Sequence, residues 1–408
     1  MNDALMAGAP PFGDGRLVTL ENWLLPPFNR WAFQHVRELI PTARIARGDG
    51  PVWELPRAES DDLNGLRFAV QPSELAPDGT LTVRELLDRT GTDGFLVIHQ
   101  GRIVTEQYFN GLRPDGPHLL MSVSKSVTSL AAGVLASQGR LDVTVPVESI
   151  VPELTGTSFE GATVQQLLDM RTGTKYREDY EDPDAEIAVS DRVYGWAPDD
   201  GKPRAADAVE YFATLVNDGP HGGPFRYRSI LTDVLGLVLE KAAGQRFSDL
   251  VAGELWQPMG AEHDADITLD AHGNALADGG ISATLRDAGR IGLLALNRGN
   301  AAGRQVIAPE WFDDLVTGAP DGPLAFRQGD GAGPGYPDGA HYRNFWWITD
   351  PGLPMYNAAG IYGQSVFVHV PSQVVVAKLS SWPAALSTPM RRATIAAVTA
   401  IASALSDG

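Results

Sequence analysis

The sequence contains no cysteine, and this absence excludes disulfide bonds, thiolate metal sites and cysteine nucleophiles. Basic residues are scarce as well, since 32 lysines and arginines stand against 51 aspartates and glutamates, which gives a net charge of −19. A surface of that sign repels phosphate backbones and anionic lipids, so we expect neither nucleic acid nor a membrane as a partner. The same charge attracts small cationic molecules.

Long apolar runs are also missing. The most apolar stretch near the C-terminus, residues 394–405, is too short and too rich in alanine to span a bilayer. The first fifteen residues lack the basic start and apolar run of a signal peptide, so we expect a cytoplasmic protein. The eight histidines are scattered, with no pair spaced four apart. We therefore expect no metal and no cofactor.

The first 140 residues carry few regular elements. Residues 1–90 are rich in Pro, Gly and Asp, which predicts an extended segment with one short helix near 83–87. Two β-rich runs within 94–110, joined at Gln100-Gly101, predict a hairpin. A helix is predicted from Ser122 to about Gln138, because apolar residues recur there at helical spacing and Gly139 follows.

The remaining chain is mainly helical to about residue 290 and then returns to strands. Helices are predicted at 164–170, 206–216, 231–244, 283–299 and about 390–405, and strands at 344–349, 364–370 and 374–380. Strands near both ends with helices between them predict an α/β fold, in which one antiparallel sheet is built from both termini and flanked by helices. We expect a single unit over 1–408, with an α/β lobe at about 1–140 and 285–408 and a mostly helical inserted lobe at about 141–284.

The sharpest local motif is Ser122-Val123-Ser124-Lys125, an S-x-x-K at the start of a predicted helix. Residues three apart on a helix are neighbours, so the lysine amine lies beside the serine hydroxyl. A serine is a weak nucleophile until a base takes its proton, and a lysine serves if burial lowers its pKa. The first helical turn also offers free N–H groups to an oxyanion.

Two further segments suit the same chemistry. Tyr227-Arg228-Ser229 precedes an apolar helix, and a tyrosine hydroxyl can relay a proton to a leaving group. Gly360-Ile361-Tyr362-Gly363 runs into a strand, where small residues let a backbone N–H approach a substrate. A core tyrosine and a plain turn are the alternatives for these two segments.

Together these motifs resemble the β-lactamase/DD-peptidase superfamily, in its class C-like esterase branch, and most of all the hydrolases of 6-aminohexanoate (nylon) oligomers. The resemblance covers nearly the whole chain and implies a β-lactamase-like fold. The segments that carry it are NRWAFQHVRELIPTA (29–43), HLLMSVSKS (118–126), EDYEDPDAE (178–186), Asp191-Arg192, Gly195-Trp196, ADGGISATLRDAGRIG (277–292) and VVVAKLSSWP (374–383).

The resemblance implies a role for each matching residue of the reaction centre. Ser122 resembles the acylated nucleophile, Lys125 the general base and Tyr227 the proton relay to the leaving amine. The backbone amides of Ser122 and Ile361 resemble the oxyanion hole. The chain therefore resembles a serine hydrolase that works through an acyl-enzyme without a cofactor.

Substrate-binding roles are implied in the same way. Tyr180 matches a tyrosine that hydrogen-bonds the scissile amide nitrogen, and Asp191 an acid that holds the substrate's ammonium group. Trp196 and Trp347 match tryptophans that close over or line the cleft. Ser229 stands where many relatives carry asparagine. The expected partners are small amides or esters, and a homodimer is the expected assembly.

Two positions depart from the pattern. Asp278 stands where the nylon-oligomer enzymes carry a neutral or basic side chain, and Tyr362 where lysine or histidine is usual. The lysine of the superfamily's third motif is missing, which argues against efficient β-lactam hydrolysis because that cation pairs with the drug's carboxylate.

Alternatives remain open at this point. An α/β-hydrolase needs G-x-S-x-G, and the nearest candidate, Gly156–Glu160, fails at its last position. The acidic run 178–186 lacks the ligand spacing of a calcium loop and is interpreted as a solvated loop. A hydrolase of linear ω-amino-acid amides and esters is the first hypothesis. A broad short-chain carboxylesterase, a D-amino-peptide hydrolase and a non-turnover penicillin-binding-type sensor are the others.

Overall fold

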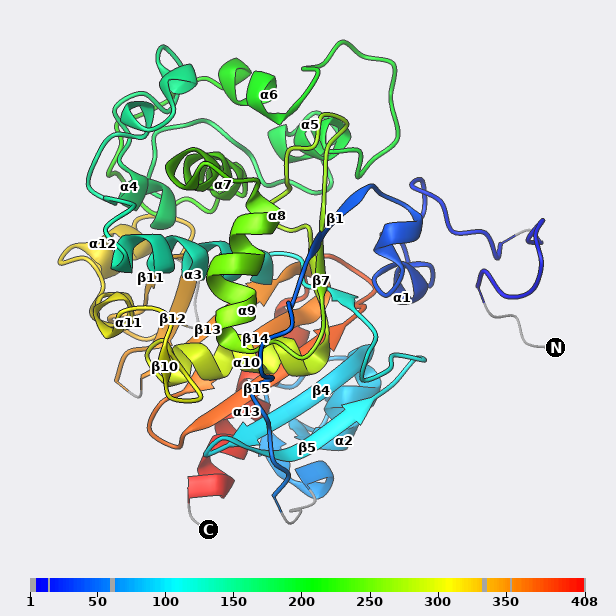
Figure 1. Ribbon diagram of the computed structural model, residues 1–408. Coiled ribbons are helices and arrows are strands. Elements are labelled where there is room, and N and C mark those ends of the chain that lie inside the picture. Colours follow the sequence, from blue (N-terminus) through cyan, green and yellow to red (C-terminus); the bar gives the residue numbers. More distant parts are fainter. Residues whose placement is uncertain (1–4, 14, 59–62, 332–335, 353, 407–408) are drawn as a thin grey trace.

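A seven-stranded antiparallel sheet organises the computed structural model, which describes residues 5–13, 15–58, 63–331, 336–352 and 354–406 (Figure 1). Its strand order is β11-β12-β13-β14-β15-β4-β5. Since β15 pairs with β4, the C-terminal strands continue the N-terminal hairpin. This confirms the predicted sheet built from both termini. Its strands are β4 (Thr92–His99), β5 (Arg102–Tyr108), β11 (His341–Arg343), β12 (Trp346–Asp350), β13 (Met355–Gly360), β14 (Gln364–His369) and β15 (Val374–Ser380).

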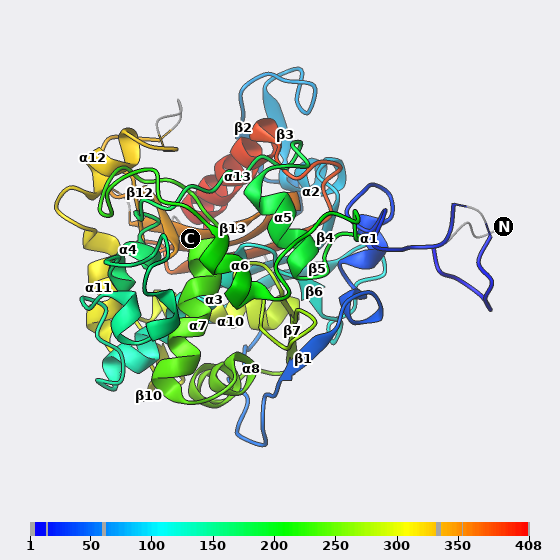
Figure 2. The same ribbon diagram turned by 90° about the horizontal axis from the view of Figure 1, so that it is seen from above.

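Helices cover both faces of this sheet (Figures 1 and 2). On one face, α2 (Val83–Arg89) and α13 (Thr388–Ser406) pack on apolar side chains of β4, β14 and β15. On the other face lie α3 (Val123–Ser137) and α10 (Leu285–Leu296). Two glycines let α10 approach the strands closely, because a Cβ at Gly292 would meet Val375 at 2.5 Å and one at Gly289 would meet Leu96 at 2.6 Å.

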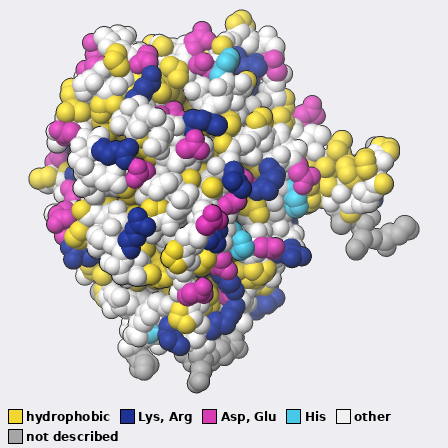
Figure 3. All heavy atoms as spheres, in the orientation of Figure 1, with side chains coloured by type: hydrophobic (Ala, Val, Ile, Leu, Met, Phe, Trp, Pro, Cys, Tyr) yellow, Lys and Arg dark blue, Asp and Glu magenta, His cyan; other side chains and the backbone are white. Residues whose placement is uncertain are grey.

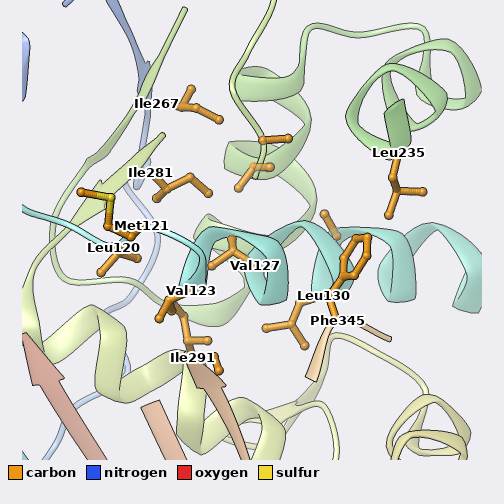
Figure 4. Packing of buried hydrophobic residues seen from close by; sticks show 14 of the residues in the cluster. Leu120, Met121, Val123, Val127, Leu130, Leu235, Ile267, Ile281, Ile291 and Phe345 are labelled. Carbon is orange, nitrogen blue, oxygen red and sulfur yellow. The ribbon is translucent and has the colours of Figure 1, made fainter. Parts of the chain in front are cut away.

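The helix α3 runs through the main core. Its residues 123–135 are all buried, including polar ones, so it has no solvent-facing side over most of its length. Figure 4 shows Val127 and Leu130 packed among hydrophobic side chains that come from α10, from β8 and from Phe345. This packing fixes the first turn of α3, and with it Ser122, against the sheet.

Residues before β4 and between the two halves of the sheet form further helices and a second sheet. The four-stranded sheet has the order β1-β7-β8-β6. Its strands are β1 (Thr42–Ile45), β6 (His118–Leu119), β7 (Ala265–Thr268) and β8 (Ile281–Ala283). The other α-helices are α1 (Asn29–Ala32), α4 (Val164–Leu168), α5 (Glu186–Val193), α6 (Ala208–Thr214), α7 (Ile230–Ala243), α8 (Phe247–Leu250), α9 (Gln257–Met259), α11 (Pro309–Thr317) and α12 (Gly322–Arg327), and a π-helical turn covers Val251–Trp256. Two small hairpins join β2 (Arg67–Ala69) with β3 (Thr80–Thr82) and β9 (Asn300–Ala301) with β10 (Arg304–Gln305). Short 3-10 helices lie at Val36–Glu38, Leu63–Gly65, Val147–Ser149, Pro152–Leu154 and Ile361–Gly363.

The predicted elements are found with shifted ends. The strand expected at 344–349 begins only at Trp346, because Asn344 and Phe345 adopt left-handed backbone angles and turn the chain between β11 and β12. Strand β13 was not predicted. The segment 328–340 is rich in Gly and Pro, and its residues 332–335 lie outside the described residues.

The surface mixes charges of both signs. Figure 3 shows Lys and Arg side chains interspersed with Asp and Glu over the face seen in Figure 1. Within the described ranges, no helix combines the length and the apolarity needed to cross a bilayer.

Candidate active site

Ser122 immediately precedes α3 and faces a cavity. Met121 before it has a φ of 48°, and this left-handed residue turns the chain from β6 into the helix. The S-x-x-K spacing brings Lys125 beneath the serine, and its Nζ donates to Ser122 Oγ at 2.9 Å. Nζ also donates to the backbone oxygen of Asp278 at 2.9 Å. Lys125 is only 1% exposed, so its ammonium group does not contact a substrate directly and acts on it through Ser122.

Strand β13 ends against this turn. A Cβ at Gly360 would lie 2.9 Å from Leu120 O and 3.0 Å from Ser122 N, so only glycine lets the strand come this close. Ile361 follows directly and lines the same cavity as Ser122. The amide of Ser122 opens a helix, where N–H groups lack intrahelical acceptors. Both residues whose amides are expected to bind an oxyanion thus line one cavity.

Tyr227 approaches the pair from the turn before α7. Its ring centroid lies 5.3 Å from Lys125 Nζ, and its ring stacks on Trp347 at 5.6 Å. Its amide donates to Asp330 Oδ2 at 2.8 Å, which fixes the turn. Burial raises the pKa of Tyr227, while the charge of Lys125 and a hydrogen bond with Ser122 oppose that shift. A neutral phenol therefore sits where it can exchange a proton with Ser122.

Acidic side chains surround Lys125. Asp278 Oδ2 lies 3.6 Å from Nζ, and Asp233 Oδ1 accepts the Asp278 amide at 3.0 Å. Burial alone lowers the pKa of Lys125, but the charge that Tyr227 carries once ionised and the charges of Asp278, Glu178 and Asp233 outweigh it, so that this pKa is raised. The expectation that burial lowers the lysine pKa is therefore wrong for the resting cleft. The sequence did not show that these acids, distant along the chain, converge on one ammonium group.

Glu178 is a residue of the site that the sequence analysis missed. It accepts the Tyr180 hydroxyl proton at 2.8 Å through one carboxylate oxygen and the Ser229 amide through the other. Because Tyr180 donates to Glu178, its oxygen remains free to accept an N–H from a substrate amide. Burial raises the pKa of Glu178, and the charge of Lys125 opposes that shift. The acidic run containing it looked like a solvated loop, and no local pattern marked Glu178.

Asp191 lies on α5, where the charges of Asp278 and Glu178 reach it. Burial, followed by the charges of Asp278 and Glu178, raises the pKa of Asp191 to about 8. Its neighbour Arg192 pairs instead with Asp200 at 3.3 Å. At neutral pH the Asp191 carboxyl is thus largely protonated, and a cation placed beside it would favour ionisation.

The remaining predicted residues occupy different surroundings. Trp347 lines the cavity of Ser122, whereas Trp196 is buried against Trp23 with ring centroids 5.0 Å apart. The Trp196 Nε1 donates to Thr268 Oγ1 at 3.0 Å, so this tryptophan supports the wall near Asp278 rather than closing over the cleft. Tyr362 lines a neighbouring hollow together with Tyr180 and Tyr227.

One cavity of about 360 Å³ joins these parts. It contains Ser122, Ile361, Tyr227, Tyr180 and Trp347 of the predicted set. The other predicted side chains, Lys125, Asp191, Trp196, Ser229 and Asp278, do not line it in the described part of the chain. The remaining lining residues are Glu178, Asp330, Asn357, Ala359, Gly360, Gly363, Gln364, Ser365, Phe367, Trp382, Ala385, Leu386, Ser387, Thr388, Arg391 and Thr394.

Comparison with known proteins gives a consistent result. A family model described as Beta-lactamase matches residues 80–400. A 6-aminohexanoate-dimer hydrolase of Paenarthrobacter ureafaciens is 37% identical over 366 residues, which cover 90% of this chain and 88% of that enzyme.

Solved structures agree with this match. A protein of Bacillus anthracis assigned as a 6-aminohexanoate-dimer hydrolase superposes with a TM-score of 0.86 at 27% identity, over 97% of this chain and 99% of that one. A family VIII carboxylesterase superposes with a TM-score of 0.59 at 16% identity, over 77% of this chain and 93% of the esterase, and shares the fold.

Proposed function

Because this chain belongs to the beta-lactamase family and is a hydrolase, we propose that it cleaves linear amides of ω-amino acids, and carboxylic esters, through an acyl-enzyme on Ser122. The observation that carries the proposal is the contact of 2.9 Å between Lys125 Nζ and Ser122 Oγ on the wall of a cavity that Tyr227 shares. The name of the relative from Paenarthrobacter ureafaciens supports the substrate class.

The first half of the reaction follows from these contacts. Ser122 Oγ attacks the carbonyl carbon, and its proton passes to Lys125 in its neutral form. The amides of Ser122 and Ile361 donate to the oxyanion. Tyr227 then donates its proton to the leaving nitrogen and is reprotonated from Lys125. The C–N bond breaks, the amine leaves, and the acyl group remains as an ester on Ser122.

The second half returns the enzyme to its starting state. A water molecule attacks the acyl ester, and its proton passes through the Tyr227 hydroxyl to Lys125. The Ser122 oxygen leaves and takes a proton back, so that the acid product and the free hydroxyl are restored. No step requires a cofactor.

The acidic side of Lys125 suits a substrate with an ammonium group. Repulsion from Asp278 contributes to the raised pKa of Asp191, and a cation beside Asp191 would relieve that repulsion. The same cation would lower the pKa of Lys125 and so release the base. Substrate charge and base activation are therefore coupled in this proposal.

The test combines one variant with one substrate pair. Ser122→Ala is expected to abolish turnover with the fold intact, and a loss of only about tenfold, or about 1.4 kcal/mol, would remove Ser122 as nucleophile. The wild type is expected to cleave the 6-aminohexanoate dimer at least about tenfold faster than its N-acetyl form, since a charge-assisted contact contributes about 1.5–3 kcal/mol. Asp191→Ala should lose this preference.

The alternatives give different results in the same assay. Cleavage of short esters with neither dimer cleaved indicates the broad carboxylesterase. Cleavage of D-amino peptides alone indicates the peptidase, and acylation of Ser122 without turnover indicates the sensor. A cytoplasmic location and a homodimer stay predictions.

A further inference from the structure

The cavity of Ser122 continues past the nucleophile onto the face of the sheet that α13 covers. In the ladder between β13 and β14, Asn357 pairs with Phe367 and Ala359 with Ser365, so these four side chains share one face. All four line the cavity, as do residues of α13. We call this inner part the α13 recess and define it by Asn357, Ser365, Phe367, Trp382, Arg391 and Thr394.

Three polar atoms in the recess have no hydrogen-bond partner. They are Asn357 Oδ1, Ser365 Oγ and the Trp382 Nε1, on residues that are 2%, 6% and 6% exposed. A buried polar group without a partner costs about 1–3 kcal/mol, and most buried groups therefore have one. All three atoms belong to residues that line the recess, so a ligand there can supply the partners once these side chains turn to meet it.

The recess favours a negative charge. Arg391 lies 5.2 Å from the ring of Trp347 and donates to the Tyr336 hydroxyl, and no ion pair links it to an acid among the described residues. Lys378 is the cross-strand neighbour of Ser365 on β15, and its side chain is fully buried. Burial lowers the pKa of Lys378 to about 7, so a nearby anion would draw a proton onto it.

An aromatic wall connects the recess to the leaving-group side of the reaction centre. Tyr227, which donates the proton to the leaving nitrogen in the proposed reaction, stacks on Trp347. Arg391 covers the same Trp347 ring. A leaving chain that starts at Tyr227 therefore runs along Trp347 toward Arg391, away from the acids around Lys125.

We propose that the α13 recess is the subsite for the leaving part of the substrate and that it selects a chain ending in a carboxylate. The inference rests on the proposed amide hydrolysis and adds the second end of the substrate to it. Arg391, Ser365 and Trp382 supply N–H and O–H donors. Asn357 supplies another once its carboxamide turns, since the two ends of an amide are interchangeable in shape.

The recess also gives the cleft a direction. Asp278 lies 3.6 Å from Lys125 Nζ, whereas the guanidinium of Arg391 lies over the Trp347 ring. A zwitterionic ω-amino-acid oligomer thus fits in one orientation, with its ammonium group on the acyl side and its carboxylate on the leaving side. This orientation places an internal carbonyl at Ser122.

The experiment compares the 6-aminohexanoate dimer with the same dimer capped as a C-terminal carboxamide. The wild type is expected to prefer the free carboxylate by about tenfold or more in kcat/KM, mainly through KM. Arg391→Met should bring the ratio near one. Arg392→Met is the matched control, because it removes the same charge from the next residue of α13, which does not line the cavity, and it should keep the preference.

Other outcomes overturn the inference. A wild-type ratio near one means that the recess holds only solvent, and equal losses on both dimers in Arg391→Met mean that the arginine is merely structural. Ser365→Ala is the second variant, since it removes the unpartnered hydroxyl and adds no bulk, and it should also reduce the preference. Unchanged preference in a folded Ser365→Ala would remove Ser365 from the subsite.

An ester pair separates this inference from the amide proposal. Acetate esters of 6-hydroxyhexanoic acid and of its amide place the same two ends on an alcohol leaving group. If no amide is cleaved but the acid ester is preferred and Arg391→Met removes that preference, the recess is right and the amide proposal is wrong. If dimers are cleaved with no effect of the carboxylate, the reverse holds.

Discussion

Replacement of Asp278 by asparagine is expected to move the activity of this hydrolase to lower pH. The carboxylate lies 3.6 Å from Lys125 Nζ and contributes to the raised pKa of that lysine. Asparagine keeps the size of the side chain and the backbone oxygen that accepts from Nζ. Without the charge, the ammonium form is less stable, the lysine pKa falls, and more of the neutral base is present at a given pH.

The separation of the two charges sets the magnitude. At 3.6 Å, an effective dielectric constant of about 20 gives about 4.6 kcal/mol, and the value for water gives about 1.2 kcal/mol. These energies correspond to about three and about one pKa units. Loss of the Asp278 charge also lets Asp233 ionise more readily, which offsets part of the effect. We therefore expect a shift of one to two units.

The assay is the pH dependence of kcat/KM for p-nitrophenyl acetate, which carries no charge of its own. The rising limb should move to lower pH in Asp278→Asn and stay in place in Asp264→Asn, whose exposed carboxylate pairs with Arg44 far from the site. An unchanged limb in Asp278→Asn would refute the account, because the nearest carboxylate would then have no influence on the base. A shift to higher pH would refute its sign.

Four further variants test the remaining contacts. Lys125→Arg keeps the charge but cannot take a proton, so kcat should fall nearly to the level without enzyme, and an active variant would exclude Lys125 as the base. Tyr227→Phe should slow amide hydrolysis more than that of p-nitrophenyl esters, because an amine must be protonated as it leaves; equal losses would contradict this role. Tyr180→Phe should show the same bias more weakly, and its loss of kcat/KM on amides should exceed that on p-nitrophenyl esters by a factor that corresponds to about 1–2 kcal/mol. Gly360→Ala should reduce kcat by a larger fraction than it reduces the thermal stability of the fold, because its Cβ would press on Ser122 N at 3.0 Å. Full activity of this variant would disprove that contact.

The sequence sufficed wherever local spacing determines the geometry. A helix places residues three apart side by side, so the contact between Ser122 and Lys125 followed from the motif alone. The hairpin of β4 and β5 followed from two β-rich runs around Gln100-Gly101. Tyr227, about a hundred residues from Ser122, was singled out from a Y-x-S motif, but its place beside the serine came from the family resemblance.

The rest depended on contacts between distant segments. Strand β13 contains Asn357, Ala358, Ala359 and Gly360, which have low strand propensity, and β14 provides its pairing partner. Glu178 became a site residue only because its loop folds back onto the turn before α7. The raised lysine pKa required the positions of four separate segments, and composition alone does not give them.

The crowding of acids around Lys125 has a further consequence for substrate choice. Asp191 and Asp233 both have raised pKa values, with repulsion from Asp278 among the causes, so the resting protein keeps protons that a solvated site would release. Such an arrangement reduces stability unless a cation balances it. A substrate ammonium group would supply the balance and release those protons. Binding of a cationic substrate should therefore release protons into the buffer, whereas binding of the N-acetylated substrate should release none. Calorimetry in buffers of different ionisation enthalpy measures the number of protons released in each case. Equal proton release by both substrates would show that the acids serve the lysine alone.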